Sequence, residues 1–135
     1  MANYWVLKTE PSTYGFDDLV RAGRAVWDGV TNPVALKHLR SMSQGDDVLI
    51  YHTGDVKAIV GFARVASAPY PDPKDTTGKL TVVELAPGER LPRPVPLSAI
   101  KAEPKLKDLA LVRMPRLSVV PVNAAQWKAL LAMGG

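Results

Sequence analysis

Short hydrophobic runs alternate with turn residues along this chain and predict short strands separated by short helices. In the first third, the apolar run at residues 4–8 is rich in aromatic and β-branched residues and predicts a strand, which Pro11 ends. The spacing of apolar residues predicts helices over residues 16–24 and 33–42, with a short strand at residues 25–27 between them.

The remaining two thirds of the chain continue the same pattern. A hairpin is expected from strands at residues 48–52 and 58–65 around the turn 53–55, and Gly61 inside the second strand indicates a bulge or a close backbone approach. The other expected elements are a stiff proline loop at 69–73, a strand at 80–85, a proline-rich edge segment at 87–96, a helix at 97–102, a helical turn at 106–111, a strand at 117–120, and a final helix at 124–133 that Asn123 caps.

This order of elements predicts a mainly β (α+β) fold: a small, strongly bent β-barrel decorated with short helices. At 135 residues, the chain is long enough for one domain with one core, which we place at residues 1–135. The strands and helices do not alternate regularly, so a doubly wound parallel sheet is disfavoured.

The segment from Trp27 to Pro33 carries the most chemical information. Asn32 has the side chain of an N-cap, and Pro33 suits the first helical position, so Trp27 and Asp28 should lie between a strand end and a helix N-terminus. An aromatic face beside backbone donors and a carboxylate can hold a flat polar ring such as a nucleobase. The alternative is that Trp27 is an ordinary core tryptophan.

Composition narrows the function classes. The chain has no cysteine, which excludes disulfides and thiol chemistry and fits a reducing, cytoplasmic compartment. Residues 1–88 carry nine Lys/Arg and ten Asp/Glu, whereas residues 89–135 carry eight and three, so the excess positive charge lies in the last third. Such a basic face attracts phosphate-bearing partners, although it also fits a plain solvated surface. No run is long enough for a membrane span, and no signal peptide is expected.

Several side chains outside the Trp27 segment are candidates for binding. Lys8 and Thr9 end one strand and Tyr51 and His52 end another, while Arg113 and Arg116 suit phosphate contacts. Each of these has an ordinary surface or core explanation as well. His38 and His52 lack partners at metal-ligand spacing, so no metal site and no cofactor is expected. A hydrolase that uses His52 with a carboxylate such as Asp28 remains an alternative.

Taken together, these blocks resemble the EVE domain family. The matching segments are residues 4–11 (YWVLKTEP), 26–30 (VWDGV), 45–46, 51–52, 61, 68–72 (APYPD) and 116–119 (RLSV). They cover nearly the whole chain in order. The resemblance implies a PUA-like fold, a bent barrel of five or six strands with helices around it, whose relatives bind RNA or modified bases.

By this resemblance, Trp27 is a wall of a pocket for a modified base in DNA or RNA. The residues that the resemblance places around it are Lys8, Thr9, Asp28, Gly29, Val30, Asn32, Tyr51 and His52. Tyr70 is a possible second aromatic wall, and Arg113 and Arg116 are the expected phosphate contacts. The resemblance implies a non-enzymatic reader of a modified base, such as a modified cytosine. We also expect a monomer without a membrane partner.

The chain also departs from the family pattern. Many members continue after the Trp-Asp-Gly-Val block with Arg-Asn-Tyr-Gln-Ala-Arg-Asn, whereas here residues 31–37 read TNPVALK. Two arginines, a tyrosine and a glutamine are therefore replaced, and these are groups able to contact a base edge or a phosphate.

Besides a nucleic-acid reader and a hydrolase, two alternatives remain open: a small-molecule or nucleoside binder that uses the same pocket, and a protein-interaction module that uses the proline-rich edge at residues 92–96.

Overall fold

A computed structural model describes residues 3–135, and its sheet follows the predicted order of elements. The strands and helices are β1 (Tyr4–Thr9), α1 (Phe16–Ala22), β2 (Ala25–Trp27), α2 (Pro33–Arg40), β3 (Asp47–His52), β4 (Ala58–Val65), β5 (Tyr70–Pro71), β6 (Thr81–Pro96), α3 (Leu97–Ala102), the 3₁₀ helix η1 (Pro104–Leu106), α4 (Ala110–Arg113), β7 (Val119–Val122) and α5 (Ala124–Met133). No helix in this part of the chain is long and apolar enough to cross a membrane.

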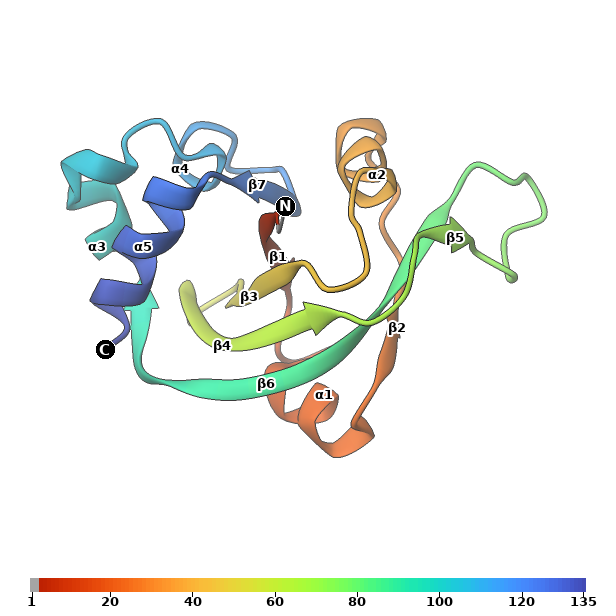
Figure 1. Cartoon of the computed structure of the whole chain (residues 1–135), viewed down its shortest axis with the longest axis horizontal. Helices are drawn as coiled ribbons and strands as arrows, with labels where there is room; N and C mark the ends of the chain where they lie inside the picture. Colours follow the sequence, from red (N-terminus) through yellow and green to blue (C-terminus); the bar gives the residue numbers. More distant parts are fainter. Residues whose placement is uncertain (1–2) are drawn as a thin grey trace.

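The strands form one curled, mixed sheet in the order β2-β6-β4-β3-β1-β7, with β5 added on β6. The pair β1 and β3 is parallel, and the other pairs are antiparallel. In Figure 1 the sheet curves around the middle of the molecule, with α2 above it, α1 below it, and α3, α4 and α5 gathered at one side. This half-barrel with short helices confirms the predicted fold class.

The strand β6 is longer than expected. The predicted strand at residues 80–85 and the proline-rich segment at 87–96 are one continuous strand of 16 residues. Val83 pairs with Trp27 of β2, Leu85 pairs with both β2 and β4, and Pro87 and Pro96 pair with β4. Proline can occupy this part because two register shifts in the β4–β6 pairing relax the hydrogen-bond pattern.

Three other predicted boundaries are corrected. The proline loop at 69–73 contains the two-residue strand β5, which pairs Tyr70 with Val82. The helical turn expected at 106–111 is split into η1 and α4. The strand expected at 117–120 is β7, two residues further on, because its register is fixed by pairing Val120 with Val6 of β1.

Gly61 in β4 marks a close approach, as its position in the sequence predicts. A Cβ at this residue would lie 2.5 Å from the ring of Phe16 in α1. The β3–β4 register shifts between Ile50 and Tyr51, opposite this point. The missing side chain therefore lets α1 pack directly on the sheet and lets the sheet bend.

Replacing Gly61 with alanine should destabilise the fold by about 1–3 kcal/mol, since the new methyl group overlaps the buried ring of Phe16. Urea denaturation followed by circular dichroism measures the loss. Gly78, which has open space at its Cβ but a φ of 73°, is the control for strain without overlap. A Gly61 variant as stable as the parent would mean that α1 does not pack this closely.

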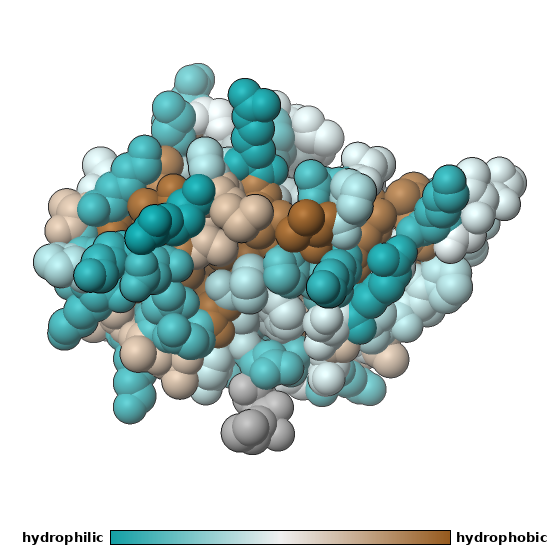
Figure 2. All heavy atoms as spheres, turned by 90° about the horizontal axis from the view of Figure 1, so that it is seen from above, coloured by the Kyte–Doolittle hydropathy of each residue, from teal (hydrophilic) through white to brown (hydrophobic). Residues whose placement is uncertain are grey.

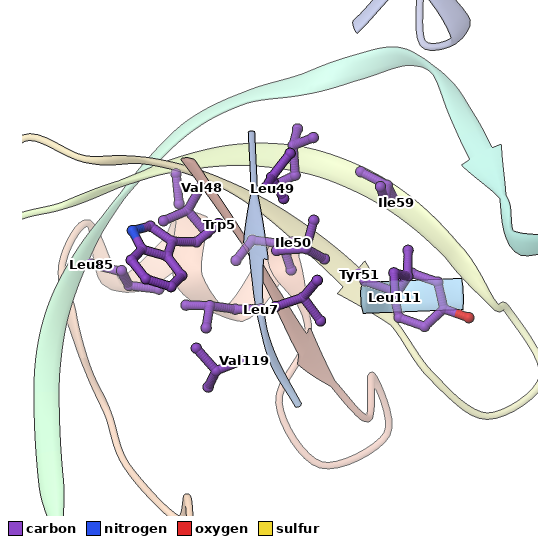
Figure 3. Close-up of a cluster of buried hydrophobic side chains, with 14 of the residues drawn as sticks. Trp5, Leu7, Val48, Leu49, Ile50, Tyr51, Ile59, Leu85, Leu111 and Val119 are labelled. Carbon is purple, nitrogen blue, oxygen red and sulfur yellow. The ribbon is translucent and has the colours of Figure 1, made fainter. Parts of the chain in front are cut away.

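The core lies between the concave side of the sheet and the surrounding helices. Figure 3 shows residues from β1, β3, β4, β6, α4 and β7 meeting in one cluster, among them Leu7, Ile50 and Val119. Leu7 and Val119 are fully buried and lie opposite each other in the β1–β7 pairing. The first strand and the last strand of the chain are thus paired at one edge of the sheet.

A buried carboxylate, Asp46, holds the turn before β3. Its side chain accepts a hydrogen bond from the indole Nε1 of Trp5 at 3.0 Å and from the backbone amide of Ser43 at 2.9 Å. The amide of Asn3 is 3.3 Å from its other oxygen. Asp46 is only 2% exposed, and these three donors replace the water that it loses.

Candidate functional site

A cavity of about 560 Å³ opens beside the loop that joins β2 to α2. Four pieces of chain line it: the end of β1, the turn before α1, the segment from Ala25 to Asn32, and Ser118 before β7. The end of β1 is joined to Ser118, because the amide of Lys8 donates to the carbonyl of Ser118 at 3.0 Å. This volume falls in the range of small-ligand pockets.

Trp27 is both a wall of the cavity and a core residue. Its side chain is only 8% exposed, and its backbone pairs with Val83 of β6. The ring of Tyr14 meets it edge to face, with the ring centroids 6.2 Å apart. The two interpretations of Trp27 therefore hold together: the indole is anchored in the core, and part of it faces the cavity beside a second aromatic ring.

The segment after Trp27 supplies polar groups to the cavity. Gly29 has a φ of 78°, so the chain turns sharply here at a conformation that glycine adopts without strain. The side-chain oxygen of Asn32 accepts from the amides of Val34 and Ala35 at 2.9 and 3.1 Å, as predicted for the N-cap. That cap uses the oxygen, so the NH₂ group of Asn32 is the part suited to a ligand.

Three charged or hydroxyl groups complete the polar lining. Asp28 is nearly half exposed and lies 3.8 Å from Lys74, a distance at which the ion pair is weak. The hydroxyl of Thr9 donates to the carbonyl of Tyr14 at 2.5 Å, so it faces a ligand as an acceptor. The ammonium of Lys8 donates to the carbonyl of Pro115 at 2.9 Å, and burial lowers the pKa of Lys8.

The structure brings together most of the predicted site but not all of it. Of the expected ligand-binding residues, the cavity lining contains Lys8, Thr9, Trp27, Asp28, Gly29, Val30 and Asn32. Tyr51, His52 and Tyr70 lie elsewhere. Tyr51 is 4% exposed at the edge of the core, beside Leu111 (Figure 3). Tyr70 lies in β5, and its hydroxyl donates to Glu84 at 3.0 Å.

His52 has a structural contact in place of the expected ligand contact. Its Nε2 accepts a hydrogen bond from the backbone amide of Phe16 at 3.0 Å and so fixes the start of α1. No hydrogen bond or ion pair joins His52 to Asp28 within residues 3–135, so these two side chains are not paired as the hydrolase alternative suggested. Burial is the main cause that lowers the pKa of His52; Arg90 adds to it, while Asp17 and Glu10 oppose it.

The fold should therefore lose stability as the pH falls below about 6.5, where a histidine in the unfolded chain begins to bind a proton. Because the pKa of His52 is lower in the folded state, the unfolded state binds more protons in this range, with a slope of at most about 1.4 kcal/mol per pH unit for one histidine. Denaturant unfolding between about pH 7 and pH 5 measures it.

Glutamine at position 52 keeps an acceptor for Phe16 but does not titrate, so H52Q should flatten part of this slope. The pKa of His38 is also lowered, by burial and by Lys37, so H38Q should remove a separate part of the dependence of stability on pH. An H52Q variant whose stability falls with pH as steeply as that of the parent would show that His52 does not contribute to this loss.

The predicted phosphate contacts Arg113 and Arg116 lie outside the cavity. Arg113 forms an ion pair with Asp108 at 3.0 Å and donates to the carbonyl of Lys107. Its guanidinium is therefore held against the turn before α4. Arg116 lines a separate shallow cavity of about 300 Å³ with Val34 and Met114. Arg113 is the last residue of α4, and Arg116 lies before β7 in a hollow that shares Asn32 with the Trp27 cavity.

Six lining residues were not among the site residues expected from the sequence: Thr13, Tyr14, Ala25, Val26, Thr31 and Ser118. Tyr14 is the most informative of them, because an aromatic residue in the polar turn after the Lys8–Pro11 block is a signal that the sequence did contain. Its place beside Trp27 depends on the turn in which the amide of Tyr14 donates to the carbonyl of Glu10 at 2.9 Å. The residues around Ser118 did not indicate a place in the cavity, since it lies there through the hydrogen bond from the amide of Lys8 to its carbonyl.

Apolar surface lies close to the cavity. Figure 2, seen from the side of α2 and α4, shows apolar side chains across the middle of this face between hydrophilic ones. Val34 and Met114 are 44% and 45% exposed and share their shallow cavity with Asn32. Val26 in the main cavity is 47% exposed. The surroundings therefore offer contacts for a ligand larger than a single base.

Comparison with known proteins places the chain in a family. The EVE domain family matches residues 3–133. The solved structure of Rpa0253 from Rhodopseudomonas palustris is 43% identical with a TM-score of 0.94, and the match covers 99% of this chain and 94% of that one. Thymocyte nuclear protein 1 of Mus musculus is 26% identical, over 98% of this chain and 74% of the mouse protein.

A third relative has been solved with a ligand. The human THYN1 protein, in complex with DNA that contains 5-methylcytosine, has a TM-score of 0.89 and 23% identity, and the match covers 98% of both chains. At this identity the likeness shows a shared fold. The PUA-like fold expected from the sequence is thereby confirmed.

Proposed function

This chain belongs to the EVE domain family, and on that premise we propose that residues 1–135 form one nucleic-acid-binding domain that recognises a modified cytosine in DNA. The cavity at Trp27 is the observation that carries the proposal. It has two aromatic rings in its walls, a carboxylate and an amide on its rim, and a volume of about 560 Å³. The DNA-bound human relative of the same fold supports DNA as the partner.

The groups in the cavity suit a base that has left the duplex stack. Trp27 and Tyr14 offer apolar faces for stacking. The carboxylate of Asp28 accepts a hydrogen bond from the exocyclic amino group of cytosine, the pairing that carboxylates make with this base. The NH₂ group of Asn32 donates to a ring acceptor, and Val26 and Val30 receive an apolar substituent such as a 5-methyl group.

The proposed role is binding without a covalent step. The cavity lining combines aromatic, hydroxyl and amide groups with one lysine and one carboxylate. Among residues 3–135, no group of three or more His, Asp or Glu side chains is arranged to hold a metal ion. The aromatic and hydrogen-bonding groups of the lining support recognition as the role of this site.

Fluorescence anisotropy titrations test the proposal. The probes are single- and double-stranded DNA oligonucleotides of one sequence that contain cytosine, 5-methylcytosine or 5-hydroxymethylcytosine, and RNA oligonucleotides of the same sequence, at low and moderate salt. The expected result is tighter binding to one modified form. Equal, salt-sensitive binding to all forms would reduce the function to a basic surface. Binding of modified RNA alone would move the proposal to RNA.

A small-molecule binder is the second candidate, since the cavity alone is large enough for a free nucleoside. Titration with 5-methylcytidine and 5-methyl-2′-deoxycytidine separates the two. A nucleoside that binds as tightly as the oligonucleotide, with little salt dependence, would favour this candidate.

A further inference from the structure

A second cavity, of about 270 Å³, adjoins the first one at Lys8. Its floor is apolar and includes Tyr51 and Leu111, both buried in the core. Three lysines line it: Lys8 from β1, Lys57 before β4 and Lys101 from α3. They come from three separate parts of the chain, so the fold, and not the local sequence, brings these ammonium groups around one hollow.

The positive charges of the three lysines are not neutralised by a carboxylate in the described part of the chain. None of them forms an ion pair with a carboxylate within residues 3–135, whereas Arg113, Arg64 and Arg24 do. Lys8 is the inner member: its ammonium lies 5.7 Å from the ring centroid of Tyr51 and donates to the carbonyl of Pro115. Burial lowers the pKa of Lys8, so an anion beside it would restore the stability of its charged form.

Two carboxylates lie near this cavity but do not line it. Glu10 is bound by the hydroxyl and amide of Ser12 and lies against Gly54. Asp55 lines an adjoining hollow that also contacts Lys57 and Lys101. An anion is therefore favoured in the cavity beside Lys8 and opposed in the hollow beside Asp55.

The backbone at Lys57 supplies an independent argument. Lys57 has a φ of 48°, the one non-glycine residue with a positive φ among residues 3–135. Glycine or asparagine adopts this conformation more easily than lysine does. The carbonyl of Lys57 accepts from the amide of Leu97 at 2.8 Å, which holds the strained residue at the edge of the cavity. Such strain is typical of positions where the side chain has a function.

We propose that this second cavity binds a backbone phosphate of the nucleic acid, the one next to the base held in the Trp27 cavity. The inference rests on the proposed function. Lys8 lines both cavities, so a base in one and its neighbouring phosphate in the other share a wall. Lys57 and Lys101 take the role that the sequence assigned to Arg113 and Arg116.

The test uses the full chain and two variants of equal charge. K57G/K101Q removes the two outer ammonium groups. Glycine at position 57 also relieves the strain of the positive φ, so the fold should be retained. The control K79Q/K128Q removes two exposed lysines that line neither cavity. Both are titrated with the preferred modified oligonucleotide, and with one in which a neutral methylphosphonate replaces the phosphate on either side of the modified base.

K57G/K101Q should lose about three- to tenfold in affinity at low salt, with a salt slope smaller by about 1, while keeping its preference for the modified base. Methylphosphonate on one side should cause a similar loss for the parent and little further loss for this variant. Equal losses for K57G/K101Q and K79Q/K128Q, or no effect of methylphosphonate on either side, would overturn the phosphate site.

The outcomes separate the two proposals. If the parent prefers the modified base but the cavity variant matches the control, the phosphate site alone fails. If the parent shows no base preference but loses affinity with K57G/K101Q and methylphosphonate, the base-reading function fails and the phosphate site stands. If the parent binds no oligonucleotide, both fail.

Discussion

Replacing Trp27 with alanine is expected to weaken binding of the preferred modified oligonucleotide by about 1–3 kcal/mol, a loss of roughly five- to 150-fold. The reason is that the indole is one of two aromatic walls of the cavity, in contact with Tyr14. Isothermal titration calorimetry of parent and variant measures the loss.

The same change should also lower the free energy of unfolding by about 3–5 kcal/mol, since only 8% of Trp27 is exposed. A matched control separates the two effects. Trp127 is equally buried but stacks on Tyr4, with ring centroids 4.7 Å apart, away from the cavity lining. W127A should lose similar stability and keep its affinity. Equal affinity losses in W27A and W127A would mean that Trp27 acts only through the fold.

The second large effect concerns stability alone. Changing Asp46 to alanine should destabilise the fold by about 3–5 kcal/mol, because it leaves the buried indole N–H of Trp5 and the amide of Ser43 without an acceptor. Thermal and urea unfolding measure the loss.

The neighbouring residue is the control for this prediction. Asp47 forms an exposed ion pair with Arg64 at 3.1 Å, so D47A should cost no more than about 1 kcal/mol. If D46A were as stable as D47A, the carboxylate of Asp46 would not be the acceptor that holds the turn before β3.

The sequence predicted the elements whose signals are local. Asn32 and Pro33 placed the start of α2, and the spacing of apolar residues placed most strands within two residues. Gly61 was identified as a close approach without knowledge of its partner, which is Phe16. The single long strand β6 could not be predicted, since proline is compatible with it only because the register with β4 shifts.

The candidate site was predicted only where its signals are local in the sequence. Residues of the Trp27–Asn32 segment are adjacent in the chain, so one local argument placed them together. Tyr51 and His52 ended a strand as expected, but the hydrogen bond from Phe16 turns His52 toward α1, a tertiary contact with no sequence signal. The lysine cluster of the second cavity was missed because Lys8, Lys57 and Lys101 are far apart in the chain.

The most direct test of modified-base recognition in the Trp27 cavity is a ¹H–¹⁵N NMR titration with matched cytosine and 5-methylcytosine oligonucleotides. The account predicts that the methylated form alone shifts the indole N–H of Trp27 and the amides of Tyr14 and Asp28, with smaller changes near Lys57 that both forms share. Identical shifts with both forms, confined to the basic surface of the last third of the chain, would contradict it.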